Sequence, residues 1–168
     1  MQKTNLKLHE ITLLGISVQT SIQFEMSPIT SKIGPCVQRF FIENLTSKME
    51  KRKKAGSTFC VYTDYESDHM GPYTFFIGEE IESANDHYFV VPEGLEKRII
   101  PAQEYAKFTT EAGPMPAVVI QAWQKIWQMK SEELGGKRSF KTDFQIHDER
   151  SANPISTILD LYVGVDPL

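Results

Sequence analysis

The apolar residues of this chain run twice through the same order of secondary-structure patterns. In the first half, alternation predicts a strand at 9–21, helical spacing predicts a helix from Pro35 to near Gly56, and "STFCVYTDY" and "YTFFIGEEIES" predict two more strands. In the second half, the extended segment "EKRIIPAQEYAKFTTEAG" precedes the helix "MPAVVIQAWQKIWQMK" and the strands "RSFKTDFQIHDER" and "STILDLYVGV". Equivalent elements are offset by about 80 residues, as an internal repeat predicts.

Such a repeat predicts an α+β fold built from duplicated β-α-β-β units. The units, at about 5–84 and 95–166, would form one antiparallel sheet with two main helices on one face, in a single domain spanning 1–168. A ligand cleft is expected between the halves. Gly15 is expected to mark a β-bulge, and Pro101 an edge or a bulge. The segment "SANDHYFVVPEG" is expected to connect the halves.

The charge of the chain argues against nucleic acid as a direct partner. Its 18 basic and 22 acidic residues give a formal charge of −4, whereas nucleic-acid binders usually present a basic face. The one basic run, "KMEKRKK", is interpreted as a solvated helix end, with a phosphate-binding patch as the weaker alternative. No apolar run reaches the length of a signal peptide or a transmembrane helix, so we expect a cytoplasmic protein without a membrane partner.

The cysteines and histidines do not form a metal-ligand pattern. Cys36 and Cys60 lack zinc or thioredoxin spacing and are expected to be buried thiols. The four histidines include no HExxH pair, and the turn "ESDHMGP" is too short for a calcium loop. We therefore expect neither a metal nor another cofactor.

Four stretches together resemble a known family. "VYTDYESDHMGPYTFFIGEEI", "VPEGLEKRIIPAQEYAKFT", "AVVIQAWQKIW" and "TDFQIHDER" are similar, in order and spacing, to the effector-binding domain of bacterial AraC-type transcription activators, also called the GyrI-like family. The similarity covers about residues 5–166. It implies the duplicated fold and a cleft for bulky, apolar and often cationic ligands, as in multidrug regulators. Some stand-alone relatives are hydrolases and others bind proteins.

The strand "TDFQIHDER" has a polar face that the resemblance turns toward the cleft. Relatives show a pattern like "DFEVYDER", whose glutamate meets a ligand cation or serves as an acid/base; here Gln145 takes its place and His147 replaces a tyrosine. An amide recognises neutral polar groups and is not a general base at neutral pH. Gln145 therefore weakens the case for cation selectivity and weakens the hydrolase case more. His147 is expected to hydrogen-bond in the pocket or at its rim, and less as a catalytic base.

Five further residues are candidates for ligand contact. Trp123 and Trp127 lie one helical turn apart, so that core packing and stacking on a ligand are alternatives for each. Tyr65 and Tyr105 are each set in a predicted strand, with cavity contact and packing equally favoured. Glu80 matches a recurrent family glutamate and could restore the charge lost at position 145, although a solvent-facing role is favoured.

These observations predict a small-molecule-binding module that acts as a sensor or sequestering protein. The domain uses almost all of the chain and leaves no room for a helix-turn-helix, so any role in transcription would require a protein partner. A hydrolase is one alternative, with no catalytic residue assigned. A protein-interaction modulator, for example an inhibitor of gyrase, is the other.

Overall fold

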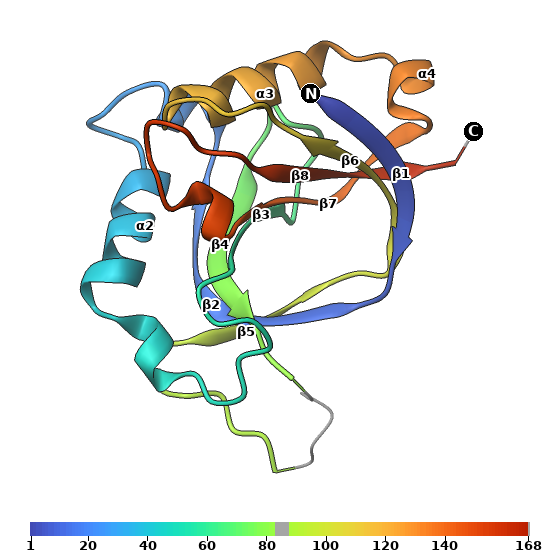
Figure 1. Ribbon diagram of the computed structural model, residues 1–168. Helices are drawn as coiled ribbons and strands as arrows, with labels where there is room; N and C mark the ends of the chain where they lie inside the picture. The colour runs from blue at the N-terminus through green and yellow to red at the C-terminus, as the bar shows by residue number, and fades with distance from the viewer. Residues whose placement is uncertain (83–87, 168) are drawn as a thin grey trace.

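Eight strands form one open, strongly curved antiparallel sheet in the computed structural model, which describes residues 1–82 and 88–167 (Figure 1). The strand order is β1-β6-β8-β7-β3-β4-β2-β5. The strands are β1 (Gln2–Leu8), β2 (Ile11–Thr20), β3 (Thr58–Thr63), β4 (Tyr73–Glu80), β5 (Glu96–Ile100), β6 (Gln103–Thr109), β7 (Lys137–His147) and β8 (Asp160–Asp166). The predicted α+β duplication with a single antiparallel sheet is confirmed.

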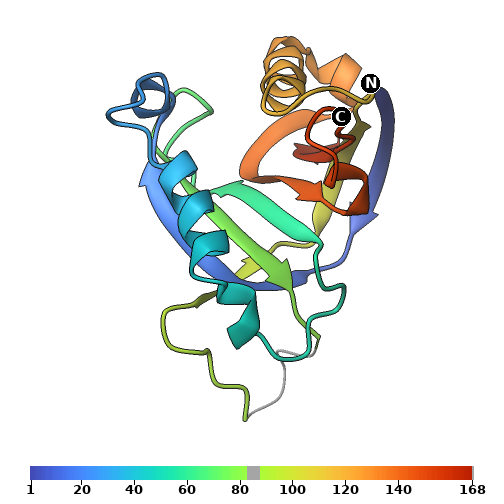
Figure 2. The same cartoon turned by 60° about the vertical axis from the view of Figure 1, so that its left-hand side comes forward.

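The helices lie on the outer face of the curved sheet, where α2 and α3 stand apart from each other (Figure 2). The helices are α1 (Ile22–Glu25), α2 (Ile33–Ile42), α3 (Ala117–Gln128) and α4 (Ser131–Leu134), with 3-10 turns η1 (Leu45–Lys48) and η2 (Glu149–Ser151). Pro35 lies in the first turn of α2, as expected. The helix does not continue to Gly56, because it ends at Ile42 and the basic run follows a 3-10 turn. None of the helices within 1–82 and 88–167 is long and apolar enough to cross a membrane.

Three pairs of strands join the two halves of the sheet. β3 of the first half pairs with β7 of the second, and Cys60 lies opposite Gln145 in this register. The first strand of each half also pairs with the second strand of the other half: β1 pairs with β6, and β5 pairs with β2. The sequence did not predict β1, whose residues are mostly exposed and polar at a sheet edge.

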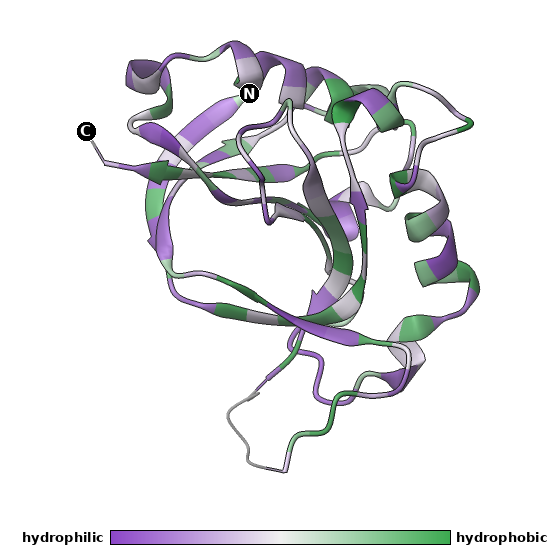
Figure 3. Ribbon diagram, turned by 180° about the vertical axis from the view of Figure 1, so that it is seen from behind, coloured by the Kyte–Doolittle hydropathy of each residue, from purple (hydrophilic) through white to green (hydrophobic). Residues whose placement is uncertain are grey.

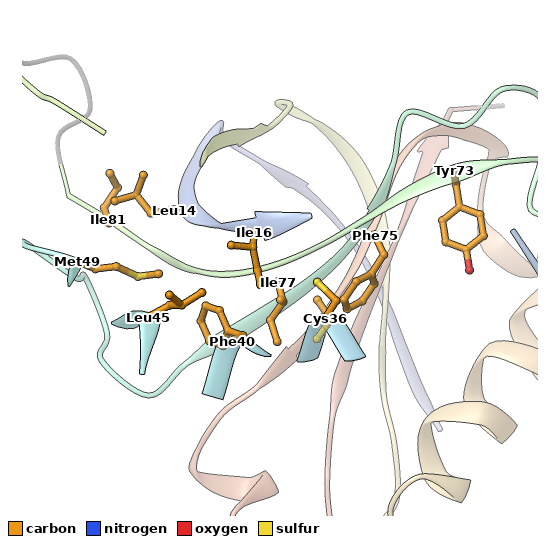
Figure 4. Packing of buried hydrophobic residues seen from close by; sticks show 11 residues of the cluster. Leu14, Ile16, Cys36, Phe40, Leu45, Met49, Tyr73, Phe75, Ile77 and Ile81 are labelled. Atoms are coloured by element: carbon orange, nitrogen blue, oxygen red, sulfur yellow. The ribbon is translucent and has the colours of Figure 1, made fainter. Parts of the chain in front are cut away.

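Three apolar clusters hold the elements together. Under α2, Cys36 and Phe40 pack beside Phe75 and Ile77 of β4 (Figure 4). A second cluster packs Trp123 and its neighbours on α3 against β6 and β8. The third fills the face opposite the helices, so side chains alternate between two buried faces. In Figure 3, hydrophobic (green) and hydrophilic (purple) residues both occur along the strands of the curved sheet. Burying each large side chain contributes about 1.5–3 kcal/mol.

The expected bulge at Gly15 is wrong. Gly15 pairs with Gly78 in a continuous register, and a Cβ atom on Gly15 would lie 1.9 Å from the Ile77 carbonyl oxygen. The glycines therefore permit close approach of β2 and β4. Pro101 does interrupt its segment, since it lies between β5 and β6.

The sheet's irregularity lies in β7 instead, between Arg138 and Asp143, where the register to β8 shifts and Phe140 has a φ of 50°. Two residues separated by an odd number of positions point to opposite faces of a regular strand. The bulge changes this parity, so the side chains of Arg138 and Asp143 meet on the helix face. The first residues of the predicted connector, 83–87 with His87, lie outside the described part of the chain.

Candidate ligand-binding cleft

Two cavities lie on the helix face at the seam between the halves. The first has a volume of about 430 Å³ and lies between α1 and the start of α2 on one side and α3 on the other. Its aromatic wall consists of Tyr62, Tyr65, Tyr73, Trp123 and Trp127. The second cavity, of about 550 Å³, is bordered by α2, by the Lys54–Thr58 loop and by the turn after β7.

The aromatic wall of the first cavity is packed into a fixed arrangement. The rings of Tyr62 and Trp123 meet edge to face at a centroid distance of 5.3 Å, and those of Tyr65 and Tyr73 lie 5.9 Å apart. Trp123 is buried, whereas Trp127 is 38% exposed and forms the rim. The cavity volume is within the range of small-molecule sites.

Gln145 lies beneath this wall, and both its amide oxygen and its amide nitrogen are hydrogen-bonded within the protein. Its Oε1 accepts a hydrogen bond from Trp123 Nε1 at 2.7 Å and a weaker one from the Tyr62 hydroxyl at 3.4 Å. Its Nε2 lies 2.9 Å from His147 Nε2. The side chain is 4% exposed and borders neither cavity. A hydrogen bond from Gln145 to a ligand, as the sequence predicts, would require movement of the side chains that cover Gln145.

These contacts fix the protonation of His147. The Trp123 indole can only donate, so the Gln145 amide must turn its oxygen toward it and its NH₂ group toward His147. The Nε2 atom of His147 must then accept, which requires a neutral imidazole with its proton on Nδ1. Burial lowers the pKa of His147 from its ordinary value of 6.5, while the nearby Asp148 carboxylate opposes this shift.

A buried charged cluster lies beside Gln145 on the same strand face. The Asp143 carboxylate, 0% exposed, accepts from Arg138 Nη2 at 2.6 Å, from the Tyr65 hydroxyl at 2.8 Å and from the Gly164 amide at 2.9 Å. Burial and the Asp143 charge raise the pKa of Tyr65 well above its ordinary value. Alternation in "TDFQIH" places Asp143 with Gln145 and His147, but its partner Arg138 depends on the bulge.

A second carboxylate, Glu25, lies in the wall of the first cavity. It accepts hydrogen bonds from the Lys32 amide at 2.9 Å and the Ile33 amide at 3.4 Å, at the start of α2. Thr20 also donates to it. No basic side chain in the described ranges, 1–82 and 88–167, forms an ion pair with it. Sequence reasoning missed this residue, because its position depends on the short α1 turn.

His69 joins the rim of the first cavity to α3. Its ring stacks on Trp127 with centroids 5.3 Å apart and an interplanar angle of 16°. Burial and the positive charge of Arg138 lower the pKa of His69 from 6.5. The 64–72 loop that carries His69 and Tyr65 thus contributes two residues to the cavity wall.

Two candidates from the sequence lie away from both cavities. Tyr105 is fully buried on the face opposite the helices, and its hydroxyl donates to the Pro101 carbonyl at 3.1 Å, so of the two alternatives for Tyr105 the structure shows packing. Glu80 pairs with Lys53 at 3.0 Å. Cys36 and Cys60 are buried free thiols, as predicted, and burial raises the pKa of these thiols to about 11 and about 12.

The fold and the cleft define a class of protein: a duplicated GyrI-like sheet with a cleft between its halves. Residues 6–165 match the family described as Cass2, integron-associated effector binding protein, and the chain belongs to this family. The resemblance inferred from the sequence is confirmed.

Individual relatives agree with this assignment. The chain is 27% identical over 151 residues to YobU of Bacillus subtilis (strain 168), and the match covers 90% of this chain and 89% of YobU. Only the name of YobU connects that protein with transcriptional regulation. An integron cassette protein from the mobile metagenome of Vibrio cholerae superposes with a TM-score of 0.74 at 26% identity, over 98% of this chain and 95% of that one. The structure of SAV2435 bound to tetraphenylphosphonium shares the fold, with a TM-score of 0.70 at 15% identity over 99% and 94% of the two chains.

Proposed function

We propose that this protein binds a bulky, largely apolar aromatic effector in the first cavity and acts as a sensor or sequestering protein. The observation that carries the proposal is the cavity of about 430 Å³ at the seam, walled by the rings of Tyr62, Tyr65, Tyr73, Trp123 and Trp127. Aromatic walls supply a large apolar contact area that leaves water when a ligand binds. Membership of an effector-binding family supports the same role.

We further propose that a positive charge on the ligand is favoured, and that Glu25 supplies the complementary charge. Arg138 and Asp143 neutralise each other, which leaves Glu25 as the carboxylate of the described cavity wall that has no ion-pair partner. Indole and phenol faces also attract cations. On the same fold, SAV2435 is described as bound to tetraphenylphosphonium, a bulky aromatic cation. Cation recognition would then have moved from position 145 to position 25.

The cellular setting follows from the same reasoning. We place the protein in the bacterial cytoplasm, where an effector signal would reach transcription through a protein partner and not through direct contact with nucleic acid. The formal charge of −4 supports the absence of direct contact with nucleic acid. A hydrolase remains the alternative, and it requires that a ligand of the first cavity is converted into a product.

The test compares tetraphenylphosphonium with the neutral triphenylphosphine oxide by isothermal titration. Glu25→Gln keeps an oxygen that can accept from the Lys32 amide and removes only the charge. We expect this variant to lose affinity for the cation on the order of tenfold, with the neutral compound little affected. Glu43→Gln, at an exposed carboxylate paired with Arg39 on α2, is the matched control and should leave both affinities unchanged. Equal losses for both ligands in Glu25→Gln would contradict the charge assignment.

A further inference from the structure

The second cavity has walls of its own. Its volume of about 550 Å³ suits a small molecule, and it shares no lining residue with the first cavity. Val37 and Phe41 of α2, together with Cys60 and Ile77 of the sheet, form the apolar side. Gln145 lies between the two cavities, since its oxygen bonds Trp123 of the first and its nitrogen bonds His147 of the second.

The rim of the second cavity exposes apolar side chains to water. Phe41 is 59% exposed and Met115 is 37% exposed, and both border the cavity. Large apolar side chains gathered at a concave surface are typical of binding sites, because a ligand removes them from water.

Each charged residue that borders the cavity has an ion-pair partner. Lys54 Nζ lies 3.0 Å from Glu149 Oε2. Asp148 Oδ2 lies 2.7 Å from Arg150 Nη2. The thiol of Cys60, whose pKa is raised to about 12 by burial, stays neutral. The wall therefore carries no unpaired charge and favours a neutral ligand.

His147 brings a directional hydrogen-bond donor to the wall of this cavity. His147 borders the cavity, and its Nε2 is used by Gln145, which leaves the proton on Nδ1. Within residues 1–82 and 88–167, Nδ1 has no hydrogen-bond partner. An N–H group in apolar surroundings is stabilised by an acceptor that a ligand can bring.

We propose that the second cavity is a binding site for a neutral, largely apolar small molecule that carries one hydrogen-bond acceptor, such as a carbonyl oxygen. The acceptor receives the Nδ1–H of His147, and the apolar part packs against Phe41, Met115 and Val37. This site is independent of the ligand of the first cavity.

Benzophenone and diphenylmethane are a matched pair of probes, because they differ in the carbonyl acceptor. In the wild type, benzophenone should shift the NMR signal of the His147 imidazole, and diphenylmethane should not. In His147→Phe, we expect the affinity for benzophenone to fall by about fivefold, the effect of one neutral hydrogen bond, with diphenylmethane changed by less than about twofold. Equal changes for the two probes, or an unmoved His147 signal, would overturn the proposal.

The variant Val37→Trp tests, without relying on His147, whether benzophenone binds in the second cavity. The indole would fill the second cavity and abolish benzophenone binding, while binding of tetraphenylphosphonium in the first cavity stays unchanged. Benzophenone binding that survives in this variant would place the probe elsewhere and contradict the proposal. If benzophenone behaves as expected and tetraphenylphosphonium does not bind, the first-cavity proposal fails and the second-cavity proposal stands.

Discussion

The indole of Trp123 donates to the amide oxygen of Gln145 at 2.7 Å, so a helix of the second half and the central strand pair of the sheet are joined by one buried hydrogen bond. Gln145 therefore holds one ring of the aromatic wall in place without lining the cavity itself. In relatives of this family the same position is expected to carry a carboxylate that meets the ligand. Here the amide satisfies two donors and one acceptor of the protein itself.

Removal of the Gln145 amide should destabilise the fold and loosen the wall. Gln145→Ala leaves the buried Trp123 Nε1 without an acceptor, which costs about 1–3 kcal/mol of the free energy of unfolding. Urea denaturation measures this loss. Gln121→Ala, at an exposed site on α3, the helix that carries Trp123, is the control and should change stability by less than about 0.5 kcal/mol. Similar losses of unfolding free energy in both variants would show that the hydrogen bonds of the Gln145 amide do not stabilise the fold.

Gln145→Glu should change the protonation of His147. A carboxylate can still accept from Trp123 and Tyr62, but it offers no donor to His147 Nε2, so the imidazole would gain a proton and donate instead. We expect the pKa of His147 to rise relative to the wild type, as NMR titration of the imidazole would show. An unchanged pKa would contradict the assigned tautomer.

The stability of the wild type should fall as the pH drops below about 6.5. Burial lowers the folded-state pKa of His147, and burial with Arg138 lowers that of His69, both from 6.5. Between the folded and unfolded pKa values the unfolded chain binds more protons, so the free energy of unfolding increases with pH in that window. Thermal unfolding across pH 5 to 8 measures the effect. His147→Phe should flatten the dependence; a profile identical to the wild type would exclude His147 as a contributor.

The ion pair between Arg138 and Asp143 should matter far more than exposed pairs. Asp143→Asn leaves a guanidinium whose side chain is only 10% exposed without its counter-charge, at an expected cost of about 3–5 kcal/mol. Asp166→Asn, which breaks the exposed pair with Lys141, should cost less than about 1 kcal/mol. Chemical denaturation of both variants measures the two losses. Equally small losses of unfolding free energy would mean that the Arg138–Asp143 pair does not stabilise the fold.

Gly15 should not tolerate a side chain. Gly15→Ala would place a methyl group against the Ile77 carbonyl and force β2 from β4, so we expect a loss of more than about 2 kcal/mol. Gly34→Ala, at a helical position with open space around it, should be neutral or stabilise by up to about 1 kcal/mol. A tolerated Gly15→Ala would show that the strands can separate locally at low cost.

The sequence predicted what depends on local periodicity. The repeated strand and helix patterns predicted the duplicated sheet, and the helical stripe placed Trp123 and Trp127 together, where both border the first cavity. Tyr105 lies on the sheet face opposite the helices. The face to which a strand residue points depends on the register of the strand, which could not be predicted from the sequence. The meeting of Arg138 and Asp143 depends on a bulge, and Glu25 depends on a four-residue helix. Neither leaves a periodic signal.

A crystal structure of the protein with tetraphenylphosphonium tests the central claim most directly. The account predicts the cation in the first cavity, against Trp123 and Trp127 and on the side of Glu25, with the Gln145–Trp123 hydrogen bond intact. A cation seated against Gln145, with the Trp123 indole displaced, would show that the effector site is built around position 145 and would contradict the account.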